Sequence, residues 1–248
     1  MKGVIVATGL GQYLSPLTVC LPKSSNYVPE RPLIDYAIEA FVNAGFEELG
    51  VVLGPNEEIL RAYLQHSARY GIAIYCLYNP WYARGSATSL YAAQPFVGGE
   101  SFILALADRI FTPHILFPLL AYPWQTHVMC VTRRHKKGFG GHNGIKVQLD
   151  AQGRVQHIGK RLPHWHAVDA GIFLFQPYIL HDLSYLLRHR AGQCSLIHLA
   201  RSLIARGQDL FACDVSHTCC AAQVDQRDLF NYTQQVLSVR LVQEEFVA

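Results

Sequence analysis

Continuous apolar runs alternate with apolar residues at helical spacing along the first half of the chain. The runs that predict strands cover residues 3–8, 48–54, 72–78, 101–108 and 126–132. The segments with helical spacing cover residues 32–45, 56–71 and 86–96. Continuous runs are typical of strands buried on both faces, and parallel neighbours need crossover connections. The pattern therefore predicts an α/β fold, a Rossmann-like, mostly parallel, doubly wound sheet with helices on both faces.

The second half has a different pattern. Two short strands are predicted around a turn at Asp150–Gly153, and further strands at 167–175 and 209–215. Helices are predicted at 177–190, 194–207 and 226–241. The basic, glycine-rich stretch at 132–144 has no periodicity, so it is predicted to be a mobile loop.

Composition narrows the class of protein. Half of the 248 residues are apolar, which allows a large core, and the formal net charge of +3 is too small to indicate a nucleic-acid partner. No apolar run reaches the roughly 18–20 residues that span a bilayer, so no membrane insertion is expected. The start of the chain is not expected to be a signal peptide, because Gly9 breaks its short apolar stretch. Seven scattered cysteines fit a reducing compartment, so a cytoplasmic protein is predicted.

Two glycines, Gly9 and Gly11, follow the first strand, and Asp108 ends the fourth. Ligands of doubly wound sheets bind beyond the carboxyl ends of the strands, so these residues are expected in one cleft. The dinucleotide fingerprint does not match, because Leu14 replaces its third glycine. A P-loop does not match either, because Lys23 is twelve residues beyond Gly11. Taken alone, the glycine pair favours an ordinary turn at a strand end.

A longer motif changes this interpretation. The stretch G-L-G-x-x-L-x-P-L-T-x-x-x-P-K, residues 9–23, resembles the signature of nucleotidyltransferases that join a nucleoside triphosphate to a phosphorylated sugar, polyol or choline. Later segments resemble the same family in the same order, including NPWYARGSATSLYAA, LALADRIF, AVDAGIFLF and AAQVDQRDLFNY. Inositol-1-phosphate and phosphocholine cytidylyltransferases are the most similar branches, and the spacing from IGK to AVDAGIF favours the inositol branch.

The resemblance implies a single nucleotidyltransferase domain of GT-A-like fold over residues 1–248. Its nucleotide-binding half covers 1–132 and its acceptor-binding half 145–248. The implied metal is Mg²⁺, held by Asp108 and Asp225. The implied catalytic residues are Lys23, Asp108 and Lys160. The residues implied to surround the nucleotide are Thr8, Gly9, Leu10, Gly11, Tyr13, Gly85 and Ser86. Those implied to contact the acceptor are Lys160, Asp169 and Gly171.

These roles have structural alternatives. Asp108 can instead cap a helix at TPHIL, and Asp225 can cap the closing helix. Lys23 can be an ordinary solvated lysine.

The implied reaction transfers a nucleoside monophosphate, with CTP favoured, to a phosphorylated polyol, cyclitol or sugar, and releases pyrophosphate. The sequence leaves open the nucleobase, the acceptor and whether the protein is a homodimer. Phosphocholine would need an aromatic or acidic cage for its ammonium group. The aromatic residues available for such a cage are Trp81, Tyr82, Trp124 and Trp165.

The match departs from the family at the glycine loop. The family usually has Ser/Thr-Arg after its G-x-G, where this chain has Gln12 and Tyr13. The family also has an acid two residues before the position of Asp225, where this chain has Gln223. Two hypotheses follow: the basic residues at 133–137 supply the missing charge, or the chain has lost activity and only binds nucleotide or a partner.

Two further groups of possible ligands stand apart from this signature. Zinc ligands are conceivable at Cys213, His217, Cys219 and Cys220, but buried apolar cysteines are the favoured interpretation. His164 and His166 are expected in a loop near the acceptor pocket rather than as a metal pair.

Overall fold

The computed structural model of the chain describes residues 1–8, 33–54, 57–65, 70–110, 112–121, 124–133, 144–216 and 222–223. The strands of the main sheet are β1 (Lys2–Ala7), β2 (Glu48–Leu53), β3 (Ala73–Tyr78), β4 (Phe102–Leu106), β6 (His127–Arg133), β7 (Lys146–Leu149), β8 (Val155–Gly159), β9 (Ala167–Phe175) and β10 (Leu210–Asp214). Two short strands, β5 (Arg109–Ile110) and β11 (Ala222–Gln223), form a separate antiparallel ribbon.

The helical elements connect these strands. The α-helices are α2 (Leu33–Asn43), α3 (Glu57–Gln65), α4 (Ser89–Val97), α5 (Phe117–Leu120), α6 (Ile179–His189) and α7 (Leu196–Ala205). Two 3₁₀ turns, η3 (Tyr82–Arg84) and η4 (Ser86–Thr88), lead into α4.

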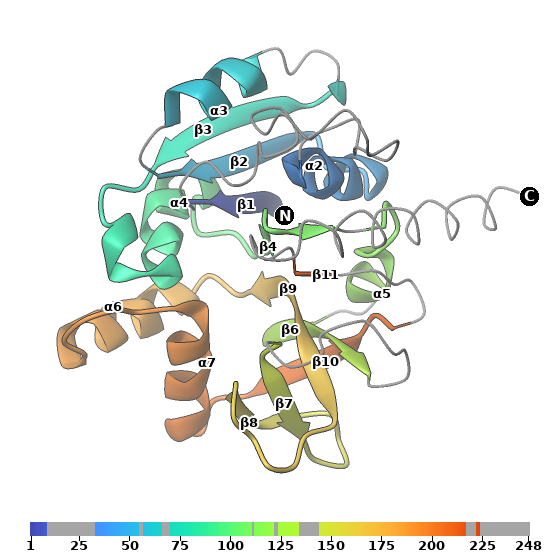
Figure 1. Cartoon of the computed structure of the whole chain (residues 1–248), viewed down its shortest axis with the longest axis vertical. Helices are drawn as coiled ribbons and strands as arrows, with labels where there is room; N and C mark the ends of the chain where they lie inside the picture. Colours follow the sequence, from blue (N-terminus) through green and yellow to red (C-terminus); the bar gives the residue numbers. More distant parts are fainter. Residues whose placement is uncertain are drawn as a thin grey trace, which may run out of the picture.

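The main sheet has the strand order β10-β6-β9-β4-β1-β2-β3, and all of these strands except β9 run in one direction (Figure 1). The reversed strand β9 also pairs with β7, which continues into β8. Strand β6 comes before β9 and β10 in the sequence but lies between them in the sheet. Strands from the earlier part of the chain (β4 and β6) therefore alternate with strands from the later part (β9 and β10).

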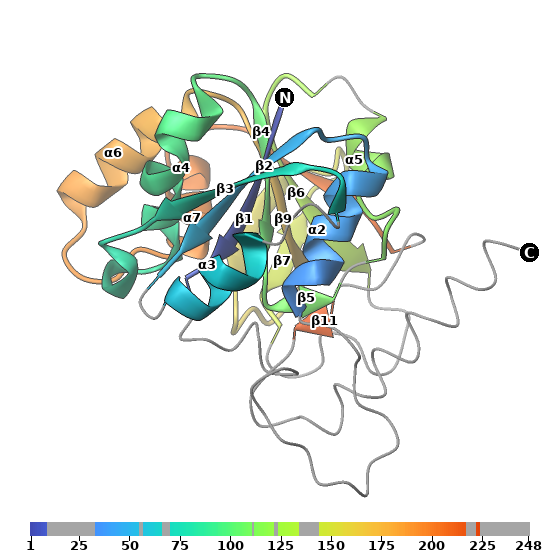
Figure 2. The same ribbon diagram turned by 90° about the horizontal axis from the view of Figure 1, so that it is seen from above.

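Each face of the sheet is covered by helices and has its own apolar core (Figure 2). Alternate residues of β1 show why: Ile5 packs into the core on the side of α2 and α3, whereas Val4 and Val6 pack into the core on the side of α4, α6 and α7. The burial of β1 on both faces explains its continuous apolar sequence.

The predicted doubly wound α/β fold is confirmed. The strands expected at 3–8, 48–54, 72–78 and 101–108 are β1 to β4, and the helices expected at 177–190 and 194–207 are α6 and α7. The elements β5, β11, α5 and η3 were not among those expected from the pattern. The closing helix expected at 226–241 and most of the basic stretch at 132–144 lie outside the described residues.

Candidate active site

The carboxyl ends of β1 and β4 meet at the point where the strand order reverses. The chain goes from β1 to β2 and β3 on one side, and then crosses to β4 on the other. Thr8 follows β1 and Asp108 follows β4, and between them the amide of Ala107 donates to the Val6 carbonyl oxygen at 3.1 Å. Such a switch point is where doubly wound sheets bind their ligands.

Thr8 is placed close to the end of β2 by a glycine. A Cβ atom on Gly54 would lie 2.7 Å from the Thr8 carbonyl oxygen, so a larger residue would push the two strand ends apart. The other residues expected in the glycine loop lie outside the described residues: Gly9, Leu10, Gly11, Tyr13 and Lys23.

Asp108 and Asp169 come from neighbouring strands and share one arginine. Asp108 Oδ1 lies 3.4 Å from Arg109 Nε. Asp169, near the start of β9, accepts a 2.8 Å hydrogen bond from the amide of Gly171. Because β9 pairs with β4, the predicted acceptor residues Asp169 and Gly171 lie beside the predicted metal ligand Asp108.

Burial controls the ionisation of both acids. It raises the pKa of Asp108 above its ordinary value, against the opposing effect of the Arg109 guanidinium. It also raises the pKa of Asp169, where Arg109 and the Gly171 amide oppose the shift and the charge of Asp108 adds to it. The helix-cap alternative for Asp108 is wrong, since β5 follows Asp108 directly and α5 begins only at Phe117.

The β5–β11 ribbon returns the end of the described chain to this site. Gln223 lies directly opposite Arg109 in the ribbon. The second predicted metal ligand, Asp225, is two residues further on and lies outside the described residues. The ribbon pairing nevertheless brings its neighbour Gln223 next to the residue that follows Asp108.

Gly85 and Ser86 have structural partners of their own. Gly85 has φ +106° and ψ 167°, and a Cβ there would overlap the carbonyl oxygen of Cys194. Ser86 Oγ accepts a 3.2 Å hydrogen bond from the amide of Leu196, the first residue of α7. The segment expected to contact the nucleobase is therefore fixed against the start of α7.

A buried asparagine also fixes the segment around Gly85 and Ser86. The fully buried Asn79 follows β3, and its Nδ2 donates to Thr88 Oγ1 at 3.0 Å. Its Oδ1 accepts from the amide of Trp81 at 2.9 Å. Neither Asn79 nor Arg109 was predicted from the sequence as a site residue. The available signal was the same for both, a polar residue placed directly after a predicted strand end.

Among the predicted acceptor residues, Lys160 lies away from Asp169 and Gly171. It follows β8 and is exposed. Gly159 pairs with Lys146 on β7, and Lys146 pairs with Val168 on β9, so Lys160 lies two strands across from the start of β9, roughly 10 Å away.

Arg133, at the end of β6, already has an acidic partner. Its Nε lies 2.7 Å from Asp214 Oδ2, and its amide donates to Ser216 Oγ. Residues 134–137 lie outside the described part of the chain.

The possible metal and aromatic groups do not gather. Among the described residues, no three His, Cys, Asp or Glu side chains come together as a metal site. Cys213 faces Cys130 across β10 and β6, and a hydrogen bond links the two thiols. His217, Cys219 and Cys220 lie outside the described residues.

The histidine pair and the aromatic residues have separate places. His166 Nδ1 accepts from the amide of Leu149 at 2.9 Å, which makes it part of the loop before β9. Trp124 Nε1 donates to the Leu119 carbonyl oxygen, and the carbonyl of Trp124 accepts from Gln176 at the end of β9, at the opposite edge of the sheet. Trp81 follows β3 and Trp165 precedes β9, with three strands between, so these aromatic residues do not form one cage.

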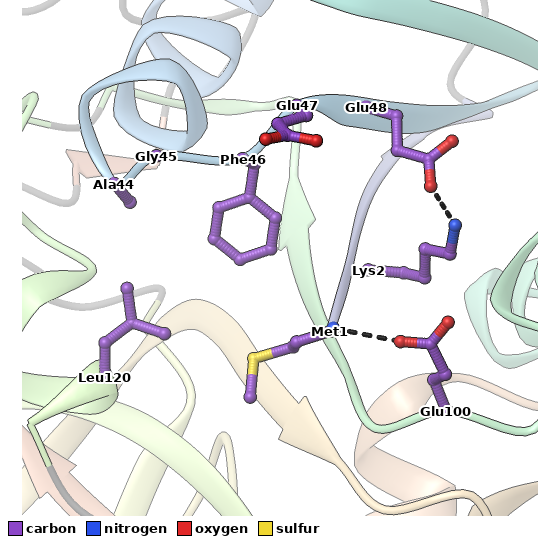
Figure 3. Close-up of a pocket in the computed structure, with 9 residues that line it drawn as sticks. All are labelled: Met1, Lys2, Ala44, Gly45, Phe46, Glu47, Glu48, Glu100 and Leu120. Atoms are coloured by element: carbon purple, nitrogen blue, oxygen red, sulfur yellow. Dashed lines mark hydrogen bonds and ion pairs between the residues drawn. The ribbon is translucent and has the colours of Figure 1, made fainter.

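The opposite edge of the sheet carries a cavity of about 480 Å³ (Figure 3). Its charged side chains are largely paired: Lys2 forms an ion pair with Glu48, and the amino group of Met1 lies 2.9 Å from Glu100. It lies at the amino ends of β1 and β2 and contains none of the predicted site residues. None of the helices in the described part of the chain has the length and apolar character needed to cross a bilayer.

An acid from each of two adjacent strands lies at the switch point of a doubly wound sheet, where α/β proteins of this class bind their ligands. The profile of the nucleotidyl transferase family matches residues 2–218. The chain belongs to that family.

Two relatives and one solved structure illustrate the similarity. The bifunctional IPC transferase and DIPP synthase of Rubrobacter xylanophilus is 31% identical over 215 residues, which are 86% of this chain and 46% of the relative. The 2-aminoethylphosphonate cytidylyltransferase of Lancefieldella rimae is 30% identical over 160 residues, 64% of this chain and 61% of the relative. The chain thus spans about half the length of the curated relatives it matches.

The fold resembles that of the inositol-1-phosphate CTP transferase from T. maritima, with a TM-score of 0.78 and 20% identity over 96% of both chains.

Proposed function

We propose that this chain is a Mg²⁺-dependent nucleotidyltransferase that transfers a nucleoside monophosphate to a phosphorylated polyol, cyclitol or sugar and releases pyrophosphate. The observation that supports this most is the meeting of Asp108 and Asp169 beside the β1–β4 switch point. The family assigns the first of these positions to the nucleotide and its metal, and the second to the acceptor.

The reaction needs no nucleophile from the protein. An oxygen of the acceptor phosphate attacks the α-phosphorus of the triphosphate, and the bond from that phosphorus to the β-phosphate oxygen breaks. Pyrophosphate carries away the electron pair. The protein's part is to align the two phosphates and to balance their charge. Thr8 and the segment around Gly85 would position the nucleotide, and Asp169 an acceptor hydroxyl.

The described residues fit a divalent cation. Asp108 Oδ1 is buried without a hydrogen-bond partner, while 29% of the side chain is exposed at the sheet edge. Mg²⁺ prefers one or two carboxylates, with water and substrate phosphates completing its shell. Asp108 would supply one carboxylate and Asp225 the other. When bound, the cation would stabilise negative charge on the phosphates.

We propose CTP as the nucleotide and a cyclitol or polyol phosphate as the acceptor. Two of the similar proteins support this choice: one is described as a cytidylyltransferase and the other as an inositol-1-phosphate CTP transferase. Other relatives are described as glucose-1-phosphate thymidylyltransferases, so a sugar phosphate stays in the test. The cysteines in the described residues are free thiols, and we propose a cytoplasmic setting.

A second candidate function follows from Tyr13. A tyrosine has no charge at neutral pH, and the family's arginine at this place would bind the leaving phosphates. A chain without that arginine could bind nucleotide and not transfer it. Arg133, one of the cations invoked as a replacement, is held by Asp214.

Pyrophosphate release distinguishes the two functions. The chain is incubated with CTP, UTP or dTTP, and with inositol-1-phosphate, glucose-1-phosphate or phosphocholine, in Mg²⁺ or EDTA. A transferase releases pyrophosphate only with acceptor and Mg²⁺ present. A binding module shows a nucleotide-induced rise in melting temperature and no pyrophosphate from any pair. Failure of both readouts would contradict the proposal.

A further inference from the structure

Arg109 is a buried cation with an unused donor. Its residue exposure is 5%, and its Nε is buried without a hydrogen-bond partner. The nearest acid, Asp108, presents an equally unpartnered Oδ1 at 3.4 Å, beyond a well-formed hydrogen bond. Burying a guanidinium this way costs free energy unless its charge is balanced nearby.

The fold makes room for this side chain at Gly171. This glycine has φ +78°, and a Cβ there would lie 3.1 Å from Arg109 Nε and 3.2 Å from its Cγ. The arginine stem therefore passes directly over the Gly171 backbone. The amide of Gly171 meanwhile holds Asp169 Oδ1, so one glycine places both the arginine and the second acid.

The three charged groups form one electrostatic unit. Asp169 lies within Coulombic range of both Arg109 and Asp108. With both acids ionised, one guanidinium leaves the group with a net charge of −1. Two close carboxylates without the arginine would make a strongly attractive site for a divalent cation, because a partly buried position screens charges weakly.

We propose that Arg109 is the built-in counter-ion of Asp108 and Asp169, and that it keeps a divalent cation from binding tightly until a nucleoside triphosphate adds its own negative charge. Metal and nucleotide then bind together. Arg109 is a positioning residue in this scheme and makes no contact with the reacting atoms. The inference rests on the proposed function in taking Asp108 as a metal ligand.

The test is a titration with Mn²⁺ in the absence of nucleotide, followed by isothermal calorimetry or electron paramagnetic resonance at about pH 8. Three proteins are compared: the wild type, Arg109→Met and Arg109→Lys. We expect weak binding by the wild type, at least about tenfold tighter binding by Arg109→Met, and wild-type behaviour for Arg109→Lys, which keeps the charge. With CTP present, the difference between wild type and Arg109→Met should shrink.

A double variant locates the effect. Arg109→Met combined with Asp108→Asn should lose the gain, since it removes one charge of each sign. Circular dichroism checks folding, and Arg109→Gln replaces Arg109→Met if that variant does not fold. Unchanged Mn²⁺ affinity in a folded neutral variant would overturn the proposal. So would a gain that survives Asp108→Asn, or a chain that folds only with a cation at position 109. No turnover is measured, so an absence of transferase activity would be a separate result.

Discussion

At the scale of single residues, the site relies on carboxylates that the fold keeps partly out of water. Asp108 is next to a buried arginine, and Asp169 is held by the amide of Gly171. Burial raises the pKa of both acids, and Arg109 limits the shift in each case. The arginine thus opposes the effect of burial on the two groups that the proposed reaction needs as anions.

Asp108→Asn is expected to lower Mg²⁺-dependent pyrophosphate release by at least about 100-fold, because it removes ligand charge with little change in shape. Asp209→Asn is the matched control. Asp209 pairs with Arg154 at the start of β10, at the other edge of the sheet. Comparable initial rates for Asp108→Asn and Asp209→Asn, with both proteins folded, would exclude Asp108 from the reaction.

Gly85 has a backbone requirement that is independent of any ligand. Gly85→Ala should lower the free energy of unfolding by about 3 kcal/mol or more, because its conformation excludes a side chain and the Cys194 carbonyl fills the space. Gly98→Ala, at φ +59° with open space around it, should cost only about 1 kcal/mol. Urea unfolding measures both. Equal losses in the two variants would mean that the Cys194 contact is unimportant.

At the scale of elements, a buried histidine joins β6 to β9 and α6. His127 is fully buried, and its Nδ1 accepts from the amide of Gln176 at 3.2 Å. Its Nε2 lies 4.0 Å from Asp182 Oδ2, and Asp182 is bound by Arg206 through its other oxygen. Burial lowers the pKa of His127 to about 4, against the opposing charge of Asp182. The folded protein therefore holds this imidazole neutral.

Stability should fall on acidification because of His127. In the unfolded chain this histidine gains a proton near pH 6.5, but in the folded protein only near pH 4. The unfolded state thus binds more protons between these values, and up to about 3 kcal/mol of stability is lost as pH falls through that window. Urea unfolding at several pH values should show a smaller slope for His127→Gln than for the wild type. The control is His157→Asn, which removes an exposed imidazole from β8 and leaves the buried one in place.

Elements could be predicted from the sequence where local patterns determine them, and could not where residues far apart in the sequence do. Burial on both faces marks β1 and β4 in the sequence, and a strand end places Asp108 at the carboxyl edge. The reversed direction of β9 is not encoded in its own apolar run, because β7 and β8 decide which edge it enters from. The role of Arg109 was not predicted either, because a charged residue after a strand end is usually solvated. The burial of Arg109 depends on Gly171, which lies far along the chain.

At the scale of the whole molecule, one strand pair brings together the residues proposed for the acceptor and those proposed for the nucleotide and its metal. β4 ends in the acid assigned to the metal, and β9, beside it, begins with the acid assigned to the acceptor. The two acids sense each other's charge across this pair. We therefore expect nucleotide and acceptor to bind at one edge of the sheet, on opposite sides of the β4–β9 pair.

The most direct test is the dependence of pyrophosphate release by Asp169→Asn on acceptor concentration, measured at saturating CTP and Mg²⁺. The asparagine oxygen can still accept from the Gly171 amide, while the charge that we propose binds an acceptor hydroxyl is lost. If Asp169 holds the acceptor, the KM for the acceptor should rise by about 10-fold to 100-fold, and the KM for CTP should stay within about twofold of the wild type. An unchanged acceptor KM in the folded variant would contradict this role of Asp169.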